Sequence, residues 1–399
     1  MSSIRRYSYH EILAAIFDTS SNDRLVPELP AELLKTQWSV NPREDSSVSF
    51  DLIPETVVFT TSGSTGKPKS VRKSRFQIAL EAEAVSEVVV QGSSTPDEVI
   101  SFAPPNHAFG FLCGIALSLR FGIPFTYNSV DAAIPVAGDG INSSLILALP
   151  ASFRTLEKSE HAFTSRHRTV VVQSAGPASP RYAETIEALQ PNGVEGFEIY
   201  GSSEAGAIGH RRTDVAPHAW TLFDDIELLP PCDTGGAPSE MIVGGPRCTQ
   251  VQQDSDMGGF RSNQSPSVRT GDIVRFVGDR RFALVGRLDR VIQINGLNTD
   301  LDVLQHRLSL NFEEVDFFVE KQLDALRGHG FVVHFFCKGS TAYVERMRRE
   351  IAYIVGENYP KHVYPSKIQF WSAPLRRSHS GKIIGLPITS PADARIDVL

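Results

Sequence analysis

The sequence is poor in cysteine, and its cysteines are not arranged for pairing. Cys113, Cys232, Cys248 and Cys337 lie far apart in a chain of 399 residues, with no CxxC pair and no Cys/His cluster of zinc spacing. A disulfide framework and the common types of structural zinc site are therefore excluded. We expect reduced, mostly buried thiols in a reducing compartment.

Long apolar runs are also lacking. The longest covers residues 109–119 and stops at Arg120, whereas a membrane-spanning helix needs about 20 apolar residues. The apolar stretch at residues 12–17 is too short for the core of a secretory signal, and no small-residue cleavage site follows it. We therefore expect a soluble, cytoplasmic protein without a membrane span.

A surplus of basic residues is absent too. The formal net charge is -7 and the sequence pI is about 5.9. This balance disfavours a nucleic-acid partner, whose phosphates attract a basic surface, but it allows a local basic pocket for one nucleotide. The length and the apolar fraction of 41% permit one large domain and a smaller one, each with its own core.

Short apolar runs alternate with helical patterns through the first half of the chain. A helix is expected near residues 9–18, and Ser74 can cap another that carries Phe76, Leu80, Val85 and Val88. A further helix is expected at 108–119. Strands are expected at 57–59, 99–103, 123–127, 145–149, 170–173 and 197–200. This alternation predicts a layered α/β core with much parallel pairing.

The sequence pattern changes after about residue 221. Short strands with Gly/Pro turns are expected there at 226–229, 240–243, 273–276 and 282–285, and they predict a β-rich subdomain. Beyond Arg287 a smaller α+β unit is expected, with strands at 291–294, 315–319 and 332–336 and helices at 301–310 and 343–355. The predicted organisation is a large α/β domain over 1–287, including the β-rich subdomain over about 221–287, and a small mobile α+β domain over 288–399.

The strongest local signal is the run Thr-Thr-Ser-Gly-Ser-Thr-Gly-Lys-Pro-Lys at 60–69. Gly63 and Gly66 permit turns with positive φ that point backbone N–H groups inward, while hydroxyls and lysines add donors and positive charge. The Walker loop is excluded, because only two residues separate the glycines and Pro68 follows Lys67. The run suits the phosphates of ATP; a polar surface loop is the alternative.

This run resembles the phosphate-binding signature of the adenylate-forming superfamily, which includes acyl- and aryl-CoA ligases, peptide-synthetase adenylation domains and luciferases. Further signatures follow in the family's order up to Lys382. The chain resembles a short member, with a reduced segment before the loop. The resemblance implies a set of ATP-phosphate ligands: Thr61, Ser62, Gly63, Ser64, Thr65, Gly66, Lys67 and Lys69.

Two turns that follow predicted strands resemble parts of the family's substrate pocket. His107, in Pro-Pro-Asn-His, would form a wall or gate of the acid-binding pocket; a core or helix-start histidine is the alternative. Ser-Ala-Gly-Pro at 174–177 is similar to the family's Gly-Gly-Ala-Pro turn. Ala175, Gly176 and Pro177 would then lie between adenine and the acyl group, since small residues let a flat ring approach the backbone. An ordinary turn is the alternative.

Tyr-Gly-Ser-Ser-Glu at 200–204 resembles the family's aromatic-Gly-x-[Ser/Thr]-Glu signature. The resemblance implies that Tyr200 stacks on adenine beside Gly201 and that Ser203 binds the α-phosphate. Glu204 would bind Mg²⁺, a hard cation that prefers carboxylate oxygen. A turn with an exposed glutamate is the alternative.

Three later segments complete the resemblance. Asp272, in Arg-Thr-Gly-Asp, would accept hydrogen bonds from ribose, and Arg287 would contact ribose or phosphate. Asp289 would be the hinge, and Gly296 would line the thiol tunnel. Lys382, in Ser-Gly-Lys, would bridge the substrate carboxylate and the α-phosphate. The family's usual Lys is replaced by Gln at position 293, and its Arg-Ile by Asn-Thr at 298–299.

The resemblance implies an AMP-forming ligase that uses ATP and Mg²⁺ to convert an aryl or fatty acid into an acyl-adenylate, and then transfers the acyl group to CoA. Two alternatives stay open: a ligase that loads the phosphopantetheine of an acyl carrier protein, and a non-catalytic nucleotide-binding relative. Some basic residues would contact CoA phosphates or an acidic carrier, or else be solvated surface charges. They are Lys69, Arg72, Lys73, Arg75, Arg376 and Arg377.

Overall fold

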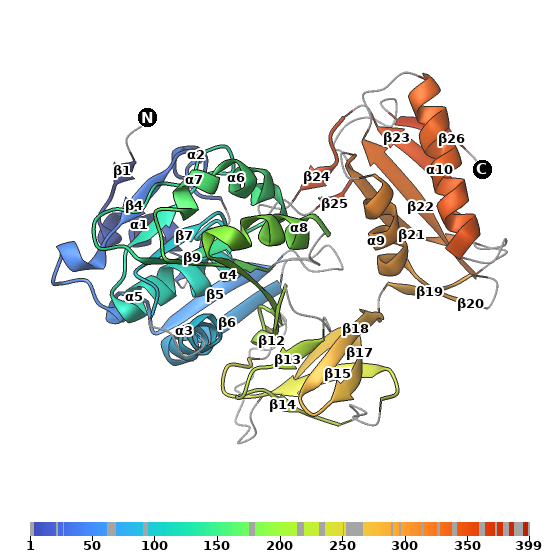
Figure 1. The fold of residues 1–399 in the computed structure, drawn as a ribbon. Coiled ribbons are helices and arrows are strands. Elements are labelled where there is room, and N and C mark those ends of the chain that lie inside the picture. The colour runs from blue at the N-terminus through green and yellow to red at the C-terminus, as the bar shows by residue number, and fades with distance from the viewer. Residues whose placement is uncertain are drawn as a thin grey trace. The chain divides into compact units, whose positions relative to one another are not determined.

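In the computed structural model the chain forms two compact units (Figure 1). The larger comprises residues 1–237, 241–270 and 276–283, and the smaller comprises 238–240, 271–275 and 284–399. The structure describes residues 4–20, 23–26, 28–61, 69–90, 95–174, 180–213, 219–230, 236–249, 251–252, 266–288, 290–294, 297–312, 315–324, 328–336, 341–358, 364–371, 373–377, 383–386 and 394–397.

Parallel strands form the centre of the large unit. Their spatial order is β8 (Phe125–Tyr127), β7 (Glu98–Ser101), β9 (Ser143–Ala148), β10 (Arg168–Gln173) and β11 (Val194–Ser202). Beside β8 lie the short strands β4 (Trp38–Val40) and β1 (Arg5–Arg6). Valine, isoleucine and leucine of the central strands are buried on both faces, as expected for a parallel sheet covered on both sides.

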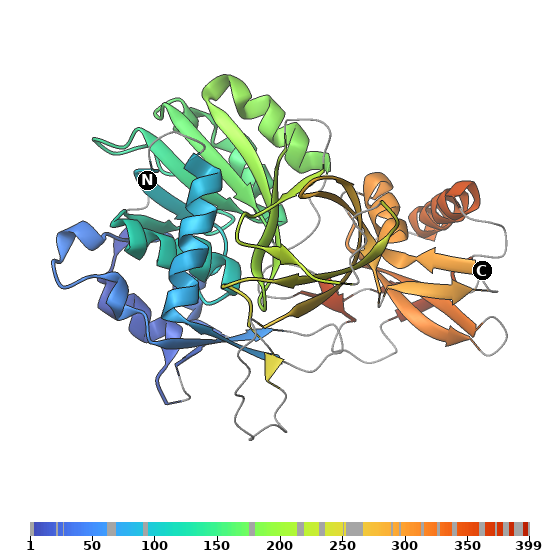
Figure 2. The same cartoon turned by 90° about the horizontal axis from the view of Figure 1, so that it is seen from below.

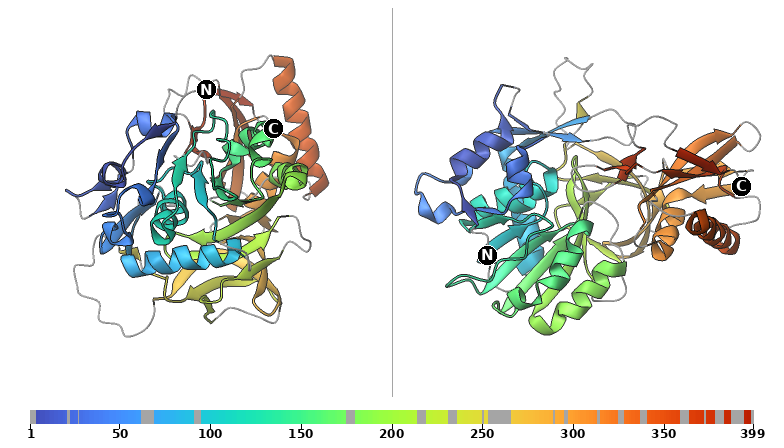
Figure 3. Two further views of the ribbon diagram at one scale, coloured as in Figure 1. Left: turned by 60° about the vertical axis from the view of Figure 1, so that its left-hand side comes forward. Right: turned by 90° about the horizontal axis from the view of Figure 1, so that it is seen from above.

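Helices cover both faces of this sheet (Figures 2 and 3). One face packs against α6 (Phe153–Lys158), α7 (Glu160–Phe163) and α8 (Pro180–Leu189). On the other face lie α3 (Arg75–Val90) and a continuous helical stretch made of α4 (Ala108–Gly110), the π-helical segment η3 (Phe111–Ala116) and α5 (Leu117–Phe121). The remaining helical elements are α1 (Tyr9–Ile16), α2 (Ala31–Lys35), η1 (Pro42–Glu44), η2 (Phe50–Leu52), η4 (Pro150–Ser152) and η5 (Gln190–Asn192).

A second sheet of the large unit frames the Gly/Ser/Thr run. Its order is β16 (Val251–Gln252), β6 (Lys69–Ser74), β5 (Thr56–Thr61), β3 (Arg24–Leu25) and β2 (Phe17–Asp18). Strands β5 and β6 are antiparallel, so the run joins two paired strands. A strand that the sequence interpretation did not predict therefore lies between the run and α3.

After β11 the chain turns into antiparallel strands. The sheet continues through β12 (Gly206–Arg212), β13 (Trp220–Leu222), β18 (Arg281–Arg287), β17 (Val268–Gly278), β15 (Ser239–Gly244) and β14 (Glu227–Leu228). The boundary between the two compact units passes through β17 and β18. The strands β14, β15, β17 and β18 overlap those that the Gly/Pro-punctuated pattern predicts, whereas β12 and β13 were not predicted.

The small unit contains a sheet with two helices on one face (Figure 3). The strand order is β20 (Leu297–Asp300), β19 (Val291–Ile294), β22 (Gly328–Phe336), β23 (Lys367–Trp371) and β26 (Ala394–Asp397), with β21 (Phe317–Asp324) also paired to β22. Helices α9 (Leu301–Asn311) and α10 (Thr341–Asn358) share its apolar core. A separate hairpin pairs β24 (Arg376–Arg377) with β25 (Ile383–Gly385). The predicted α/β fold class is confirmed.

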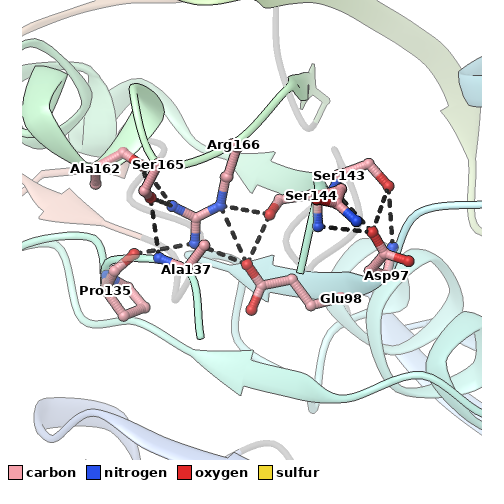
Figure 4. Close-up of polar contacts among 10 residues, drawn as sticks. Asp97, Glu98, Pro135, Ala137, Ser143, Ser144, Ala162, Ser165 and Arg166 are labelled. Atoms are coloured by element: carbon pink, nitrogen blue, oxygen red, sulfur yellow. Dashed lines mark hydrogen bonds and ion pairs between the residues drawn. The ribbon is translucent and has the colours of Figure 1, made fainter. Parts of the chain in front are cut away.

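A buried arginine fastens the amino ends of the parallel strands (Figure 4). Arg166 donates to the carboxylate of Glu98 at 2.7 Å and to Oγ of Ser144 at 2.5 Å. It also donates to the carbonyl oxygens of Ala162 at 2.6 Å and Pro135 at 2.9 Å. This edge of the sheet is thus occupied by structural contacts. In open α/β sheets ligands bind at the opposite edge, outside the carboxyl ends of the strands.

Some local predictions need correction. Phe76 does not lie on the buried face of α3, where Ile78, Ala82 and Val85 pack; it is 68% exposed. The first helix ends at Ile16, because the next two residues pair with β3.

Other predictions of the sequence hold. Ser74 caps α3, accepting a hydrogen bond from the amide of Gln77 at 3.2 Å. Cys113 and Cys248 are free, buried thiols, as expected. Within the described residues, no helix has the length and apolarity needed to cross a membrane.

Candidate functional site

The sequence-predicted site residues divide into two groups. Those that the structure describes are Thr61, Lys69, His107, Tyr200, Gly201, Ser203, Glu204, Asp272 and Arg287. The others lie outside the described residues: Ser62, Gly63, Ser64, Thr65, Gly66, Lys67, Ala175, Gly176, Pro177, Asp289, Gly296 and Lys382. Their predicted roles stay predictions.

The two ends of the Gly/Ser/Thr run are held together. Thr61 and Lys69 stand opposite each other in the β5–β6 register, so the strands that enter and leave the run are paired up to its ends. The phosphate-binding role of the residues between them stays a prediction.

Strand β11 delivers the Tyr-Gly-Ser-Ser-Glu motif to the carboxyl edge of the sheet. The β11–β12 register shifts between Tyr200 and Gly201, and the chain then turns sharply into Gly206. A Cβ atom at Gly201 would overlap the carbonyl oxygen of Gly206, so only glycine fits this close approach. Oγ of Ser202 accepts a hydrogen bond from the amide of Ala205 at 3.1 Å. The motif is therefore a tight, internally bonded turn.

The ring of Tyr200 is held by two aromatic neighbours. Its centroid lies 5.7 Å from that of Trp220 on β13 and 5.7 Å from that of Phe282 on β18, in tilted and edge-on arrangements. The guanidinium of Arg211 lies over the Trp220 ring, 4.4 Å from its centroid. Edge-on packing of this kind orients a ring without covering it by a parallel stack. The orientation of the Tyr200 ring is thus fixed by its two neighbours, and its adenine-binding role stays a prediction.

Glu204 is fixed through its backbone and not through its carboxylate. Its carbonyl oxygen accepts hydrogen bonds from Nζ of Lys73 at 2.9 Å and from the amide of Thr249 at 2.9 Å. The half-buried carboxylate makes no hydrogen bond or ion pair within the part of the chain that the structure describes. It is available to a cation.

The ligands that this turn offers fit Mg²⁺ bound together with a nucleotide better than a cation held by protein side chains alone. Among the described residues, no group of three or more His, Cys, Asp and Glu side chains is arranged around a common point for a metal ion. Mg²⁺ is commonly bound by one or two carboxylates together with substrate phosphates and water. Glu204 can supply one such carboxylate, provided that a nucleotide supplies the rest.

Beneath the turn lies a buried charge cluster that the sequence interpretation missed. It consists of Lys73 on β6, Glu81 on α3, Asp225 and Arg247. Arg247 donates to Glu81 at 2.7 Å and to both oxygens of Asp225 at 2.6 Å. Burial lowers the pKa of Lys73 to about 8, although the carboxylate of Glu81 partly opposes this shift.

The interpretation of Lys73 as a surface contact for CoA or a carrier protein is wrong, because the residue is only 2% exposed. The burial of Lys73 could have been predicted from the alternation of side chains along a strand. Lys73 lies two residues after Val71, and residues i and i+2 of a strand share a face. Val71 is fully buried, so Lys73 points into the same interior.

His107 stands at the start of the helical stretch that follows β7. Its carbonyl oxygen accepts a hydrogen bond from the amide of Phe111 at 2.7 Å, and its amide donates to Pro104 at 3.1 Å. A Cβ atom at Gly110 would overlap the carbonyl of Pro104, so the turn is tightly closed. The next turn, η3, is π-helical, a feature frequent at functional sites. The helix-start location is observed; the pocket role stays a prediction.

Asp272 and Arg287 come together within the small unit. Nη1 of Arg287 donates to Oδ1 of Asp272 at 2.8 Å. Gly271, which precedes Asp272, has φ +72°, and its carbonyl oxygen accepts a hydrogen bond from the amide of Leu288 at 2.8 Å. Two residues predicted separately for the ribose region therefore form one pair.

Comparison with known proteins identifies the family. The family described as AMP-binding enzyme matches residues 23–232, which is more than half of the chain. The chain therefore belongs to the AMP-binding enzyme family, and the predicted resemblance is confirmed.

Individual relatives are more distant. The chain is 29% identical over 255 residues to a 4-coumarate–CoA ligase of Halorhodospira halophila, covering 63% of this chain and 56% of that one. It is 20% identical over 332 residues to bacitracin synthase 2 of Bacillus licheniformis, covering 77% of this chain and 12% of that one. The chain thus spans about half the length of the first of these relatives.

Solved structures support the fold. An o-succinylbenzoate CoA synthetase of Bacillus subtilis, in complex with its acyl-adenylate intermediate, matches with a TM-score of 0.61 and 18% identity, covering 82% of this chain and 68% of that one. ATP-bound MatB of Rhodopseudomonas palustris matches with a TM-score of 0.58 and 17% identity, covering 82% of this chain and 66% of that one.

Proposed function

We propose that the chain uses ATP to activate an aryl or fatty carboxylic acid as an acyl-adenylate, releasing pyrophosphate, and then transfers the acyl group to a thiol. One observation carries the proposal. The strand that leaves the Gly/Ser/Thr loop is tied, through Lys73, to the carbonyl of Glu204 at 2.9 Å. The strand that follows the loop and the Tyr-Gly-Ser-Ser-Glu turn are thereby joined by a direct contact, which supports one nucleotide site for the two motifs.

In this proposal the loop residues 61–69 cradle the β- and γ-phosphates, and Tyr200 stacks on adenine opposite the turn at 175–177. Asp272 accepts hydrogen bonds from ribose, with Arg287 beside it. Ser203 hydrogen-bonds the α-phosphate, and the side chain of His107 lines the acid pocket. Glu204, together with the phosphates, would hold Mg²⁺, which would supply positive charge to neutralise the nucleotide.

The chemistry needs positioning and positive charge more than proton transfer. An oxygen of the substrate carboxylate forms a bond to the α-phosphorus while the bond to the β-phosphate oxygen breaks, and pyrophosphate leaves. A general base is unnecessary, because a carboxylic acid is already ionised at neutral pH. Lys382 stabilises the charge that develops between the carboxylate and the α-phosphate.

The second step joins the acyl group to sulfur. The thiol sulfur attacks the acyl carbonyl, the bond to AMP breaks, and the thiol proton passes to solvent. Rotation of the small domain about Asp289 would withdraw Lys382 and admit the thiol past Gly296. The proposed domain limits are 1–287 and 288–399.

CoA is the proposed acceptor, and the phosphopantetheine of an acyl carrier protein is the second candidate. The relatives include 4-coumarate–CoA ligases, whose name includes CoA, and this supports CoA as the acceptor. Cytoplasmic location is proposed from cysteine usage, since both described cysteines are free thiols. A competition between CoA and a pantetheinylated carrier protein, with the acyl-adenylate preformed, distinguishes the two acceptors by the thioester that accumulates.

The test of activation is acid-dependent exchange of labelled pyrophosphate into ATP. A panel of aryl, medium-chain and hydroxylated acids is screened, and at least one should support exchange that Lys382→Ala reduces strongly. If no acid supports exchange while ATP still binds, the remaining candidate, a non-catalytic nucleotide-binding relative, replaces the proposal.

A further inference from the structure

The buried cluster under the Glu204 turn joins three segments that are distant in sequence. Lys73 donates to the carbonyl oxygens of Glu204 and Arg247. Glu81, from α3, accepts from the amide of Ala207 at 2.7 Å and from Arg247 at 2.7 Å. The side chains of Lys73, Glu81 and Arg247 are all at least nine-tenths buried.

The cluster bonds to backbone on both sides of the turn. Lys73 holds the carbonyl at Glu204, and Glu81 holds the amide at Ala207. Gly206, between these two contacts, has φ +77°, and a Cβ atom there would overlap the Glu81 carboxylate. The turn is therefore pressed against Glu81 with no space for another side chain.

Burial of three charged groups is costly, and apolar residues of similar volume could fill this space with equal or greater stability. Stability alone does not require the cluster. Its hydrogen bonds, however, fix backbone atoms of Glu204, whose carboxylate is proposed to bind a cation. Supporting groups of this kind set the direction and strength of a metal ligand.

We propose that Lys73 and Glu81 are positioning residues, which fix the Glu204 turn in the geometry that presents its carboxylate to the cation bound with the nucleotide. This inference rests on the proposed function for the identity of the ligand. It deepens that proposal by tying the strand after the phosphate loop to the metal-binding turn through one ammonium group.

The amino edge of the same sheet offers a matched control. Glu98, like Glu81, is a mostly buried glutamate paired at 2.7 Å with a fully buried arginine (Figure 4). Glu98→Gln therefore makes the same chemical change as Glu81→Gln, at a place outside the proposed binding site. Lys73→Met removes the ammonium while keeping most of the side-chain volume.

Two measurements on the full chain test the inference. Hydrogen–deuterium exchange without ligand reports how fast the backbone amides of 202–207 exchange. The pyrophosphate–ATP exchange assay gives the Mg²⁺ concentration at which the rate is half-maximal. We expect Lys73→Met and Glu81→Gln to speed amide exchange in 202–207 and to raise the half-maximal Mg²⁺ concentration about tenfold or more. Glu98→Gln should lower thermal stability while leaving both quantities at wild-type values.

The outcomes separate the two proposals. If Lys73→Met and Glu81→Gln leave amide exchange in 202–207 unchanged, or change it no more than Glu98→Gln does, the positioning role is overturned. If the wild-type chain supports no acid-dependent exchange, the proposed function fails, and Mg²⁺-dependent ATP binding by calorimetry replaces the rate. The positioning role of Lys73 and Glu81 is then tested by the amide exchange of 202–207 and by the Mg²⁺ dependence of ATP binding.

Discussion

Nη1 of Arg287 donates a hydrogen bond to Oδ1 of Asp272 at 2.8 Å, and Gly271, next to Asp272, has a left-handed backbone conformation. An ion pair of this geometry holds the carboxylate in one orientation. In the proposed function the same carboxylate accepts hydrogen bonds from the ribose hydroxyls. The pair then explains why an arginine and an aspartate predicted for the same sugar come together.

The first prediction concerns this pair. Asp272→Ala should raise the KM for ATP about tenfold, because a charge-assisted hydrogen bond is worth roughly 1.5–3 kcal/mol. It should also abolish the preference of the wild-type chain for ATP over 2′,3′-dideoxy-ATP in the exchange assay. Asp316→Ala, which breaks an exposed pair with Arg377, is the control and should keep that preference. An Asp272→Ala variant that still prefers ATP would remove ribose binding from this residue.

The second prediction concerns the aromatic partner of adenine. Tyr200→Phe should keep the KM for ATP within about twofold, whereas Tyr200→Leu should raise it about tenfold or more, since stacking on a base is worth roughly 1–3 kcal/mol. Steady-state kinetics with ATP varied at saturating acid gives both values. Equal KM values for the two variants would show that no base stacks on this ring.

The third prediction concerns the close approach at Gly201. Gly201→Ala should lower the free energy of unfolding by about 1–3 kcal/mol, because the added methyl group meets a backbone oxygen that cannot move freely. Gly138→Ala is the control, since no atom lies within 4 Å of a Cβ atom built there. Urea denaturation measures both variants. A Gly201→Ala chain as stable as Gly138→Ala would contradict the described turn.

The fourth prediction is a pH effect in the small unit. The hydrogen bond from His334 at 3.0 Å holds the pKa of Glu320 below its ordinary value of 4.5. A carboxyl whose pKa is lower in the folded chain stabilises the fold above its unfolded pKa, and this contribution is lost as pH falls through the folded pKa. The difference in unfolding free energy between wild type and Glu320→Gln should therefore shrink below about pH 4.5, the ordinary pKa of a glutamate. A difference that is constant from neutral to acidic pH would exclude this linkage.

Much of the fold could be predicted from patterns among residues that are neighbours in the sequence. The central strands are uninterrupted runs such as Leu145–Ala148 in β9, and α3 begins at a serine that can cap it. Such signals depend only on neighbours in sequence. The π-helical turn at Phe111–Ala116 and the exposure of Phe76 depend on how the helices pack, so the apolar pattern alone gave no sign of them.

The site shows the same division. Glu204 and Tyr200 stand in a motif that the sequence displays openly. Lys73 does not, since its function in the fold depends on partners 131 and 174 positions away. A buried lysine is also rare enough that a surface role is the natural first interpretation. Only its position two residues after Val71, on the same face of the strand, indicates that its side chain is buried.

The central claim is that the chain makes an acyl-adenylate, and direct detection of that product tests it best. The chain is incubated with ATP, Mg²⁺ and each acid of the panel in the absence of any thiol, and the quenched mixture is analysed by mass spectrometry. The account predicts an acid-specific acyl-AMP together with one equivalent of pyrophosphate, both lost in Glu204→Gln and kept in Glu98→Gln. Bound ATP with no acyl-AMP from any acid, or equal product from Glu204→Gln, would contradict it.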